Sequence, residues 1–203
     1  MSDEVKDDIK IFGKWSNIVE VNDYGLKPYV NLKQLMIPRS AGVPQKRRFH
    51  KSDMHIVERL VLHLMRPGHS GKKHRITSGS IGGNYSKVLK IVEDSFKIIE
   101  EKTKENPLAI FVKALENAAV REEITSFQMG GMMARSAVVT SPQRRVDHAL
   151  RLFAQGTYKR TFGKKTSAAE ALSTEIIEAY NNTDKSLAVS EKLRLEREAS
   201  SSR

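Results

Sequence analysis

Residues 106–156 read NPLAIFVKALENAAVREEITSFQMGGMMARSAVVTSPQRRVDHALRLFAQG and combine two helix starts with one hairpin. Asn106-Pro107 and Ser141-Pro142 each place a capping residue before a proline, the pairing that opens a helix. Gly130-Gly131 lies between β-compatible runs, which predicts a two-residue turn and a β-hairpin over residues 121–139. The expected cross-strand pairs are Met129 with Met132, Phe127 with Ala134, and Ser126 with Arg135. Neither face is apolar throughout, so we expect the hairpin to project.

Apolar residues at helical spacing continue on both sides of this segment. Six helices are expected. The first has Ser52 as its N-cap and stops at Pro67-Gly68, the second spans 85–104, and the third follows Asn106. The fourth runs from Ser141 to Gly156, the fifth follows the capping box Ser167–Glu170, and the sixth spans 185–198. Residues 68–83 are expected to form a Gly/Ser-rich loop and residues 199–203 a polar tail. The predicted fold class is mainly α: a bundle of about six helices with a protruding two-stranded β-hairpin and an extended N-terminal arm.

The first fifty residues differ from the rest. Short apolar runs alternate with breakers and no helical period persists, which predicts one or two short strands followed by a basic linker. Few apolar residues are available to hold this arm to a helical core, and Phe12 and Trp15 are its expected anchors. We therefore divide the chain into an N-terminal extension, residues 1–50, and a helical core, residues 51–203, that includes the hairpin.

Positive charge is concentrated in two blocks. The chain carries 35 Lys and Arg against 24 Asp and Glu, a net charge of +11. Residues 39–75 hold ten basic and two acidic side chains, and residues 144–165 hold seven and one. Such blocks are typical of a nucleic-acid footprint, although a generally basic surface without a partner is the alternative. The candidate RNA-binding residues are Arg39, Lys46, Arg47, Arg48, Lys51, Lys72, Lys73, His74, Arg75, Arg135, Arg144, Arg145, Lys159, Arg160, Lys164 and Lys165.

No catalytic or metal-binding pattern emerges from the residues. The chain has no cysteine, which excludes disulfides, thiolate zinc sites and a cysteine nucleophile. Five of the six histidines lie between His50 and His74, but none pairs with another at i,i+3 or i,i+4 on one helical face. Neither a P-loop nor a dinucleotide fingerprint is present. We predict no catalytic residues, no cofactor and no metal.

The chain offers no window near the ~18 uncharged apolar residues that a membrane span needs. The first residues, Met1 to Glu4, are acidic and precede no apolar stretch, so we expect no secretory signal. These features predict a protein without a membrane partner, located in the cytoplasm.

Several short strings, in order along nearly the whole chain, resemble one known family. They are Phe12-Gly13-Lys14-Trp15, Ile56–Leu60, Gly71-Lys72-Lys73, Glu105–Leu108, Arg121-Glu122, Ser141-Pro142 with Arg144-Arg145-Val146, Ala169-Glu170 with Leu172, Glu175–Ile177 with Ala179, and Leu195–Ala199. Their order and spacing are similar to those of small-ribosomal-subunit protein seven in its archaeal and eukaryotic form.

The resemblance implies a structural protein of the ribosome that binds the 3′ major domain of small-subunit rRNA and nucleates assembly of the subunit head. It implies that the hairpin lies near exit-site tRNA and the mRNA exit path, and that neighbouring head and platform proteins are partners. One departure concerns the hairpin tip, where the family carries more arginine. The tip residues expected at this site are Gln128, Met129, Gly130, Gly131, Met132 and Met133. Flexible methionines suit apolar contact with a base or a protein.

Two other classes of protein fit parts of the sequence. A free-standing helical DNA- or RNA-binding architectural protein would share the basic turns, but a recognition helix needs Arg, Asn or Gln along one face. Residues 145–155 offer only Arg145, Arg151 and Gln155. A small RNA-processing enzyme would need a clustered acid/base set, which we do not find.

Overall fold

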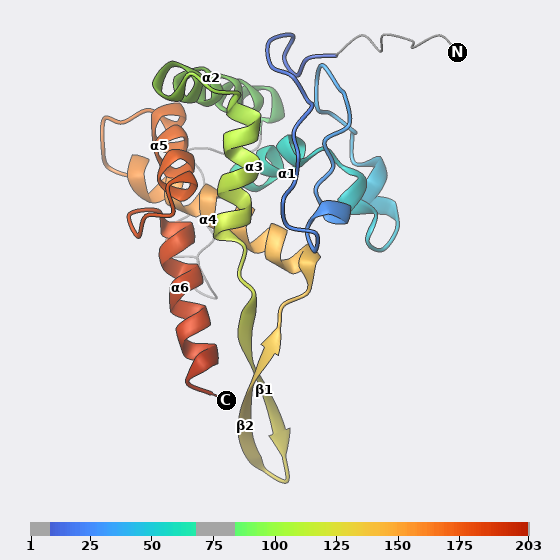
Figure 1. Ribbon diagram of the computed structural model, residues 1–203, viewed down its shortest axis with the longest axis vertical. Coiled ribbons are helices and arrows are strands. Elements are labelled where there is room, and N and C mark those ends of the chain that lie inside the picture. Colours follow the sequence, from blue (N-terminus) through green and yellow to red (C-terminus); the bar gives the residue numbers. More distant parts are fainter. Residues whose placement is uncertain (1–8, 68–83, 203) are drawn as a thin grey trace.

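The computed structural model describes residues 9–67 and 84–202 (Figure 1). Six α-helices and one hairpin follow the arm: α1 (Ile56–Leu64), α2 (Tyr85–Thr103), α3 (Pro107–Ala118), β1 (Glu122–Met129), β2 (Met132–Val139), α4 (Pro142–Thr161), α5 (Ala168–Tyr180) and α6 (Leu187–Ser200). Three short 3₁₀ turns, Lys27–Tyr29, Val43–Lys46 and His50–Asp53, lie before α1. The predicted mainly helical fold with a protruding hairpin is confirmed. Within the described ranges no helix is long and apolar enough to cross a membrane.

The two proline-capped starts and the hairpin lie where the sequence predicts them. Asn106 caps α3 by accepting the Leu108 N–H, and Pro142 opens α4. β1 and β2 are antiparallel with the predicted register, Met129 opposite Met132 and Ser126 opposite Arg135. Gly130 and Gly131 both have positive φ, the conformation that such a two-residue turn requires. The hairpin projects from the helical body, and α6 runs beside its base (Figure 1).

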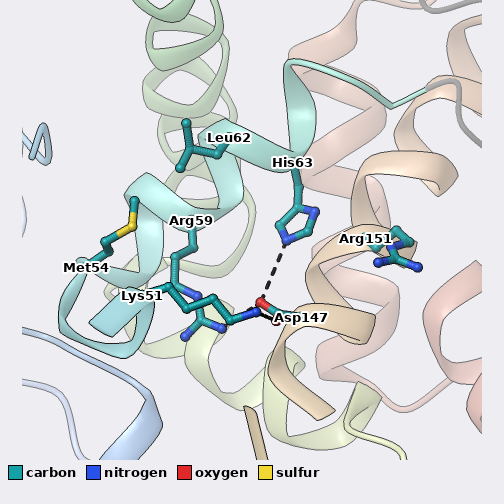
Figure 2. Close-up of a pocket in the computed structure, with 7 residues that line it drawn as sticks. All are labelled: Lys51, Met54, Arg59, Leu62, His63, Asp147 and Arg151. Carbon is teal, nitrogen blue, oxygen red and sulfur yellow. Dashed lines mark hydrogen bonds and ion pairs between the residues drawn. The ribbon is translucent and has the colours of Figure 1, made fainter. Parts of the chain in front are cut away.

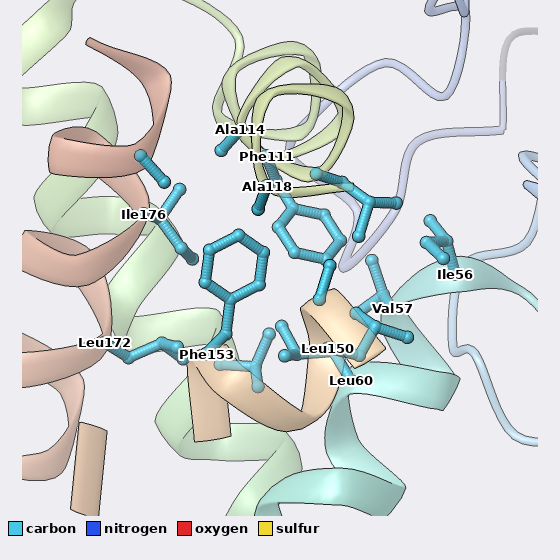
Figure 3. Packing of buried hydrophobic residues seen from close by; sticks show 14 of the residues in the cluster. Ile56, Val57, Leu60, Phe111, Ala114, Ala118, Leu150, Phe153, Leu172 and Ile176 are labelled. Carbon is cyan, nitrogen blue, oxygen red and sulfur yellow. The ribbon is translucent and has the colours of Figure 1, made fainter. Parts of the chain in front are cut away.

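The core is built around three phenylalanines from three helices. Phe96 of α2, Phe111 of α3 and Phe153 of α4 follow one another with ring centroids 6.0 and 6.2 Å apart. Figure 3 shows Phe111 and Phe153 enclosed by aliphatic side chains from α1, α4 and α5. Because these residues are fully buried, the helices share one hydrophobic core rather than separate ones.

The arm packs on this core more firmly than the sequence suggests. Trp15 lies edge-on to Phe96 at 5.8 Å and its indole N–H donates to Glu100 Oε2 at 2.9 Å. Ile11, Leu26 and Val30 are also buried in the core cluster. The expected short strands do not form in residues 9–50, where isolated bridges such as Ile11 with Trp15 replace them. The expectation of few anchoring residues is therefore wrong, because the apolar side chains of the arm pack against helices that lie much later in the sequence.

Three helix ends differ from the prediction. His55, not Ser52, caps α1, since residues 50–53 form a 3₁₀ turn. Helix α4 passes through Gly156 and ends at Thr161, because that glycine lies against another helix rather than at a helix end. Helix α6 continues to Ser200, so the first two residues of the expected polar tail, Ala199 and Ser200, belong to the helix. The predicted capping box of Ser167 and Glu170 is confirmed.

Histidine at the cap of α1 gives the fold a pH dependence. The Val57 N–H donates to His55 Nδ1 at 3.2 Å, and burial lowers the pKa of His55 from 6.5 to about 4. The unfolded chain therefore protonates His55 more readily than the folded chain does. The contribution of neutral His55 to stability is complete above pH 6.5 and is lost as pH falls toward 4. Between pH 7 and 5 we expect a loss of about 2 kcal/mol from this residue. The measurement is urea unfolding at both pH values.

His55→Asn serves as the comparison, because asparagine also caps helices but does not titrate in this range. The variant should lose about 2 kcal/mol less than the parent chain over the same pH interval. Equal losses in the two proteins would show that His55 does not carry the effect.

Candidate nucleic-acid interface

Helix α4 turns one face to the core and the other to solvent. Val146, Ala149, Leu150 and Phe153 are buried. Arg144, His148, Arg151 and Lys159 recur at helical spacing on the opposite face, where all but the half-buried His148 are exposed. Four groups that can carry positive charge thus follow one side of a single rigid helix.

A groove runs beside the first half of α4. One cavity of about 270 Å³ is lined by Lys51, Met54, Arg59, Leu62, His63, Asp147 and Arg151 (Figure 2). A second, of about 260 Å³, is lined by Lys51, Ser141, Gln143, Arg144, Asp147, His148 and Arg151. Because the two share Lys51, Asp147 and Arg151, we treat them as one site, the α4 groove. Of the described side chains that line it, six are basic or histidine and one, Asp147, is acidic.

Asp147 organises the basic side chains of the groove. Its Oδ1 accepts from Arg59 Nη2 at 2.8 Å, and its Oδ2 is paired with Lys51. His63 Nε2 lies 4.0 Å from Asp147 Oδ1 (Figure 2). Burial alone would raise the pKa of Asp147, but the interactions with His63, Lys51 and Arg59 outweigh burial and hold the pKa well below its usual range. The carboxylate is therefore charged at neutral pH and links α4 to α1.

The arginine pair at the start of α4 divides between two roles. Arg144 is exposed, and its guanidinium donates to both carboxylate oxygens of Glu123, from Nε at 2.5 Å and from Nη2 at 2.8 Å. Arg145 is expected to be exposed, but its side chain is only 11% exposed and Nη2 donates to Asp23 Oδ2 at 2.8 Å. That expectation is wrong because an acid of the arm, distant in sequence, covers Arg145.

The remaining predicted residues that the structure describes lie outside the lining of the α4 groove. In the linker, Arg39 lies over the Tyr85 ring and Arg48 over Phe49, with 5.7 and 4.9 Å to the centroids. The exposed members are Arg39, Lys46, Arg47, Arg48, Arg135, Lys159, Lys164 and Lys165. Arg160 instead points inward to Glu175 at 2.9 Å and to Glu178. Lys72, Lys73, His74 and Arg75 lie outside the described residues.

The hairpin tip is exposed and almost uncharged. Met129, Met132 and Met133 extend into solvent with Gln128 and the glycine turn. Phe127 is also exposed and lies opposite Ala134, two positions along the strand from Met129. Because alternate residues share a face, Phe127, Met129, Met132 and Ala134 form one apolar side of the tip.

Arg151, His63 and His148 are functional candidates that sequence reasoning misses. Arg151 follows Arg144 by seven residues and His148 by three, so helical spacing alone could have found it. His63 lies on α1, and only the packing of α1 against α4 brings it to the groove. Across residues 9–67 and 84–202 no group of three or more His, Cys, Asp or Glu is placed to hold a metal ion.

A helical body with a basic groove, an exposed basic linker and a projecting hairpin with an almost uncharged tip is typical of a nucleic-acid-binding protein. The family model described as ribosomal protein S7p/S5e matches residues 32–203. Two relatives, both named small ribosomal subunit protein uS7, come from Nanoarchaeum equitans and Methanococcoides burtonii. They are 48% and 42% identical, over 96% of this chain and 99% of their own length in both cases.

The chain belongs to the ribosomal protein S7p/S5e family. As a member it is a structural, non-enzymatic component of the small ribosomal subunit, located on ribosomes in the cytoplasm. Binding to rRNA and a role in translation follow from the same membership.

Proposed function

We propose that the chain binds the 3′ major domain of small-subunit rRNA through the α4 groove, the linker and the residues beyond α4, and that this contact nucleates assembly of the subunit head. The observation that carries the proposal is the convergence of Lys51, Arg144, Arg151, His63 and His148 on one open groove. Arginine forks and lysine ammonium groups are suited to phosphate, and among the described residues the carboxylates paired with them are Asp147 and Glu123.

Two features of the groove favour a bound anion. The Ser141 side chain accepts no hydrogen bond at the start of α4, so the first N–H groups of that helix are left for another acceptor. Among the described residues, His148 Nδ1 is buried without a hydrogen-bond partner. Burial lowers the pKa of His148, and Arg151 and Arg144 lower it further against the opposing effects of Glu123 and Glu191. A phosphate would accept hydrogen bonds from the N–H groups of α4 and offset the positive charge of the two arginines.

The hairpin is proposed to lie near exit-site tRNA and the mRNA exit path, with head and platform proteins as neighbours. The apolar side of the tip supports contact with an unstacked base or a protein surface, because methionine and phenylalanine offer no charge to phosphate. Arg135 is the one cation of the distal hairpin, and it lies on the opposite face from Phe127. Affinity for rRNA is therefore assigned to the groove and linker rather than to the tip.

The proposal is tested by removing two groove cations. Arg144→Gln with Arg151→Gln should weaken binding to a 3′ major domain rRNA fragment by tenfold or more, since charge-assisted hydrogen bonds contribute about 1.5–3 kcal/mol each. Two lost phosphate contacts should also make the slope of log affinity against log salt shallower by about 1.5. Both quantities come from filter-binding or fluorescence titrations at several salt concentrations.

Lys97→Gln with Arg194→Gln is the matched control, because it removes the same two charges from α2 and α6. Lys97 is half-buried and Arg194 is exposed, and both are paired with carboxylates, as Arg144 is. Equal slopes for the two double variants would contradict the proposal. Equal affinity of the parent chain for duplex DNA would instead favour a free-standing architectural protein.

A further inference from the structure

A second basic cavity lies at the base of the hairpin, away from the α4 groove. It has a volume of about 710 Å³ and is lined by residues from the arm, α3, the ends of the hairpin, α4 and α6. Figure 1 shows these elements meeting where β1 leaves α3 and β2 returns to α4. Among the described residues, four cations, Lys113, Arg121, Arg145 and Lys192, and two acids line it.

Two residues that line this cavity each carry a buried polar atom without a hydrogen-bond partner among the described residues. Thr140, at the end of the hairpin, is 5% exposed and its Oγ1 is unpaired. Arg145 Nε is the second. An arginine Nε–H can only donate, so the missing partner must be an acceptor. Leaving such a donor unpaired costs about as much as a lost hydrogen bond, and native proteins seldom do so without a reason.

The two acids of the cavity are already engaged. Asp23 accepts from Arg145 Nη2 and from the Gly25 N–H, both at 2.8 Å. Glu116 Oε1 accepts from the N–H groups of Asn22 and Asp23 at 2.6 and 3.1 Å. Neither carboxylate is therefore available to the unpaired donors.

Two of the cations form no ion pair with a carboxylate of the described residues. Lys192 Nζ donates to a neutral group, the Asn117 carbonyl, at 2.8 Å. Burial lowers the pKa of Lys192, and the nearby Arg121 and Arg145 lower it further, against the opposing effects of Glu196 and Asp23. Glu196 Oε1 accepts the backbone N–H of Arg121 at 3.0 Å. The described lining of the cavity thus holds more cations than acids, together with unpaired donors.

We propose that this cavity is a binding site for a phosphate group, held by Arg121, Thr140, Arg145 and Lys192. Two guanidinium groups, a hydroxyl and an ammonium supply more donors than one carboxylate could accept, whereas a phosphate offers three oxygens. The phosphate could belong to an RNA backbone or to a free phosphate-bearing molecule, because the chemistry is the same. The inference goes beyond the proposed function and does not depend on it, since it concerns different residues on a different side of α4.

The test titrates the full chain with inorganic phosphate at constant ionic strength and follows the backbone amide resonances of Arg121 and Thr140. Saturable shifts are expected at these two amides, with weaker or no response to acetate. Thr140→Val should bind phosphate about tenfold more weakly, because one hydrogen bond to a charged group is lost. Its melting temperature without phosphate should not fall, since the hydroxyl has no partner to lose.

Thr125→Val is the matched control, because Thr125 is exposed on β1 outside the cavity. Arg121→Gln is a second variant that should bind phosphate more weakly. Because Arg121 is also exposed, its replacement should not prevent folding. Displacement of phosphate by the rRNA fragment would identify a backbone phosphate as the source, and simultaneous binding of both would identify a free phosphate. The absence of saturable shifts, or equal affinity of the parent chain and Thr140→Val, would overturn the proposal.

Discussion

Replacing Asp147 with alanine is expected to lower the free energy of unfolding by about 3 kcal/mol. Arg59 is the reason: its side chain is 3% exposed, and its guanidinium is held by Asp147 and by the Tyr29 carbonyl at 2.8 Å. Removal of the carboxylate leaves a buried charge with one neutral acceptor, which is far more costly than loss of a surface pair. Urea unfolding at pH 7 measures the change.

Asp94→Ala is the control, since Asp94 is a half-buried acid on α2 whose ion-pair partner among the described residues is Lys97. It should cost less than about 1 kcal/mol. A similar small cost for Asp147→Ala would mean that solvent reaches Arg59 and compensates its charge.

The same carboxylate predicts loss of stability in acid. The pKa of Asp147 is lower in the folded than in the unfolded chain, so its contribution is complete above pH 4 and is lost as pH falls further. This interval lies below that of His55, so the two residues can be separated in one pH series. In Asp147→Asn the loss of stability below pH 4 should be smaller than in the parent chain.

A second large effect is expected at Glu175, which joins three helices. The side chain is fully buried. Its carboxylate accepts hydrogen bonds from Arg160 Nε at 2.9 Å, Ser186 Oγ at 2.8 Å and the Ala188 N–H at 3.3 Å. Glu175→Ala removes an acceptor shared by α4 and the start of α6 and leaves a cavity. We expect a loss of about 3–4 kcal/mol in urea unfolding, the range for breaking a buried ion pair.

Glu178→Ala is a stringent control because Glu178 pairs with the same Arg160 but is partly exposed. Its expected cost is about 1 kcal/mol or less. If both substitutions cost the same, Arg160 and not the buried position of Glu175 would set the stability.

The sequence predicts the elements of this fold better than their long-range contacts. Proline caps and apolar spacing place the helices, and two glycines fix the hairpin register, because these signals are local. Gly156 is misread as a helix end because its actual role is to leave room for Glu175, whose carboxyl carbon would lie 2.7 Å from an added Cβ. Nothing near residue 156 in the chain reveals that approach.

At the candidate nucleic-acid interface, too, the sequence predicts local features better than long-range contacts. Charge blocks locate the linker and α4, but they cannot distinguish an exposed arginine from one paired with a distant acid. Arg145 and Arg160 are predicted alongside Arg144, yet their partners Asp23 and Glu175 are separated from them by 122 and 15 residues. Helical spacing would have added Arg151, whereas His63 requires the packing of α1 on α4.

The docking of the arm also has a consequence for synthesis of the chain. Asp23 leaves the ribosome long before its partner Arg145, which follows 122 residues later. At about 5–20 residues per second, the interval is roughly 6–24 s. During that time Ile11, Trp15 and Leu26 have no completed core to enter, so the arm is translated before the core but is among the last segments to reach its native contacts. Chaperones that act on nascent chains would therefore meet the arm before the core that holds it has formed.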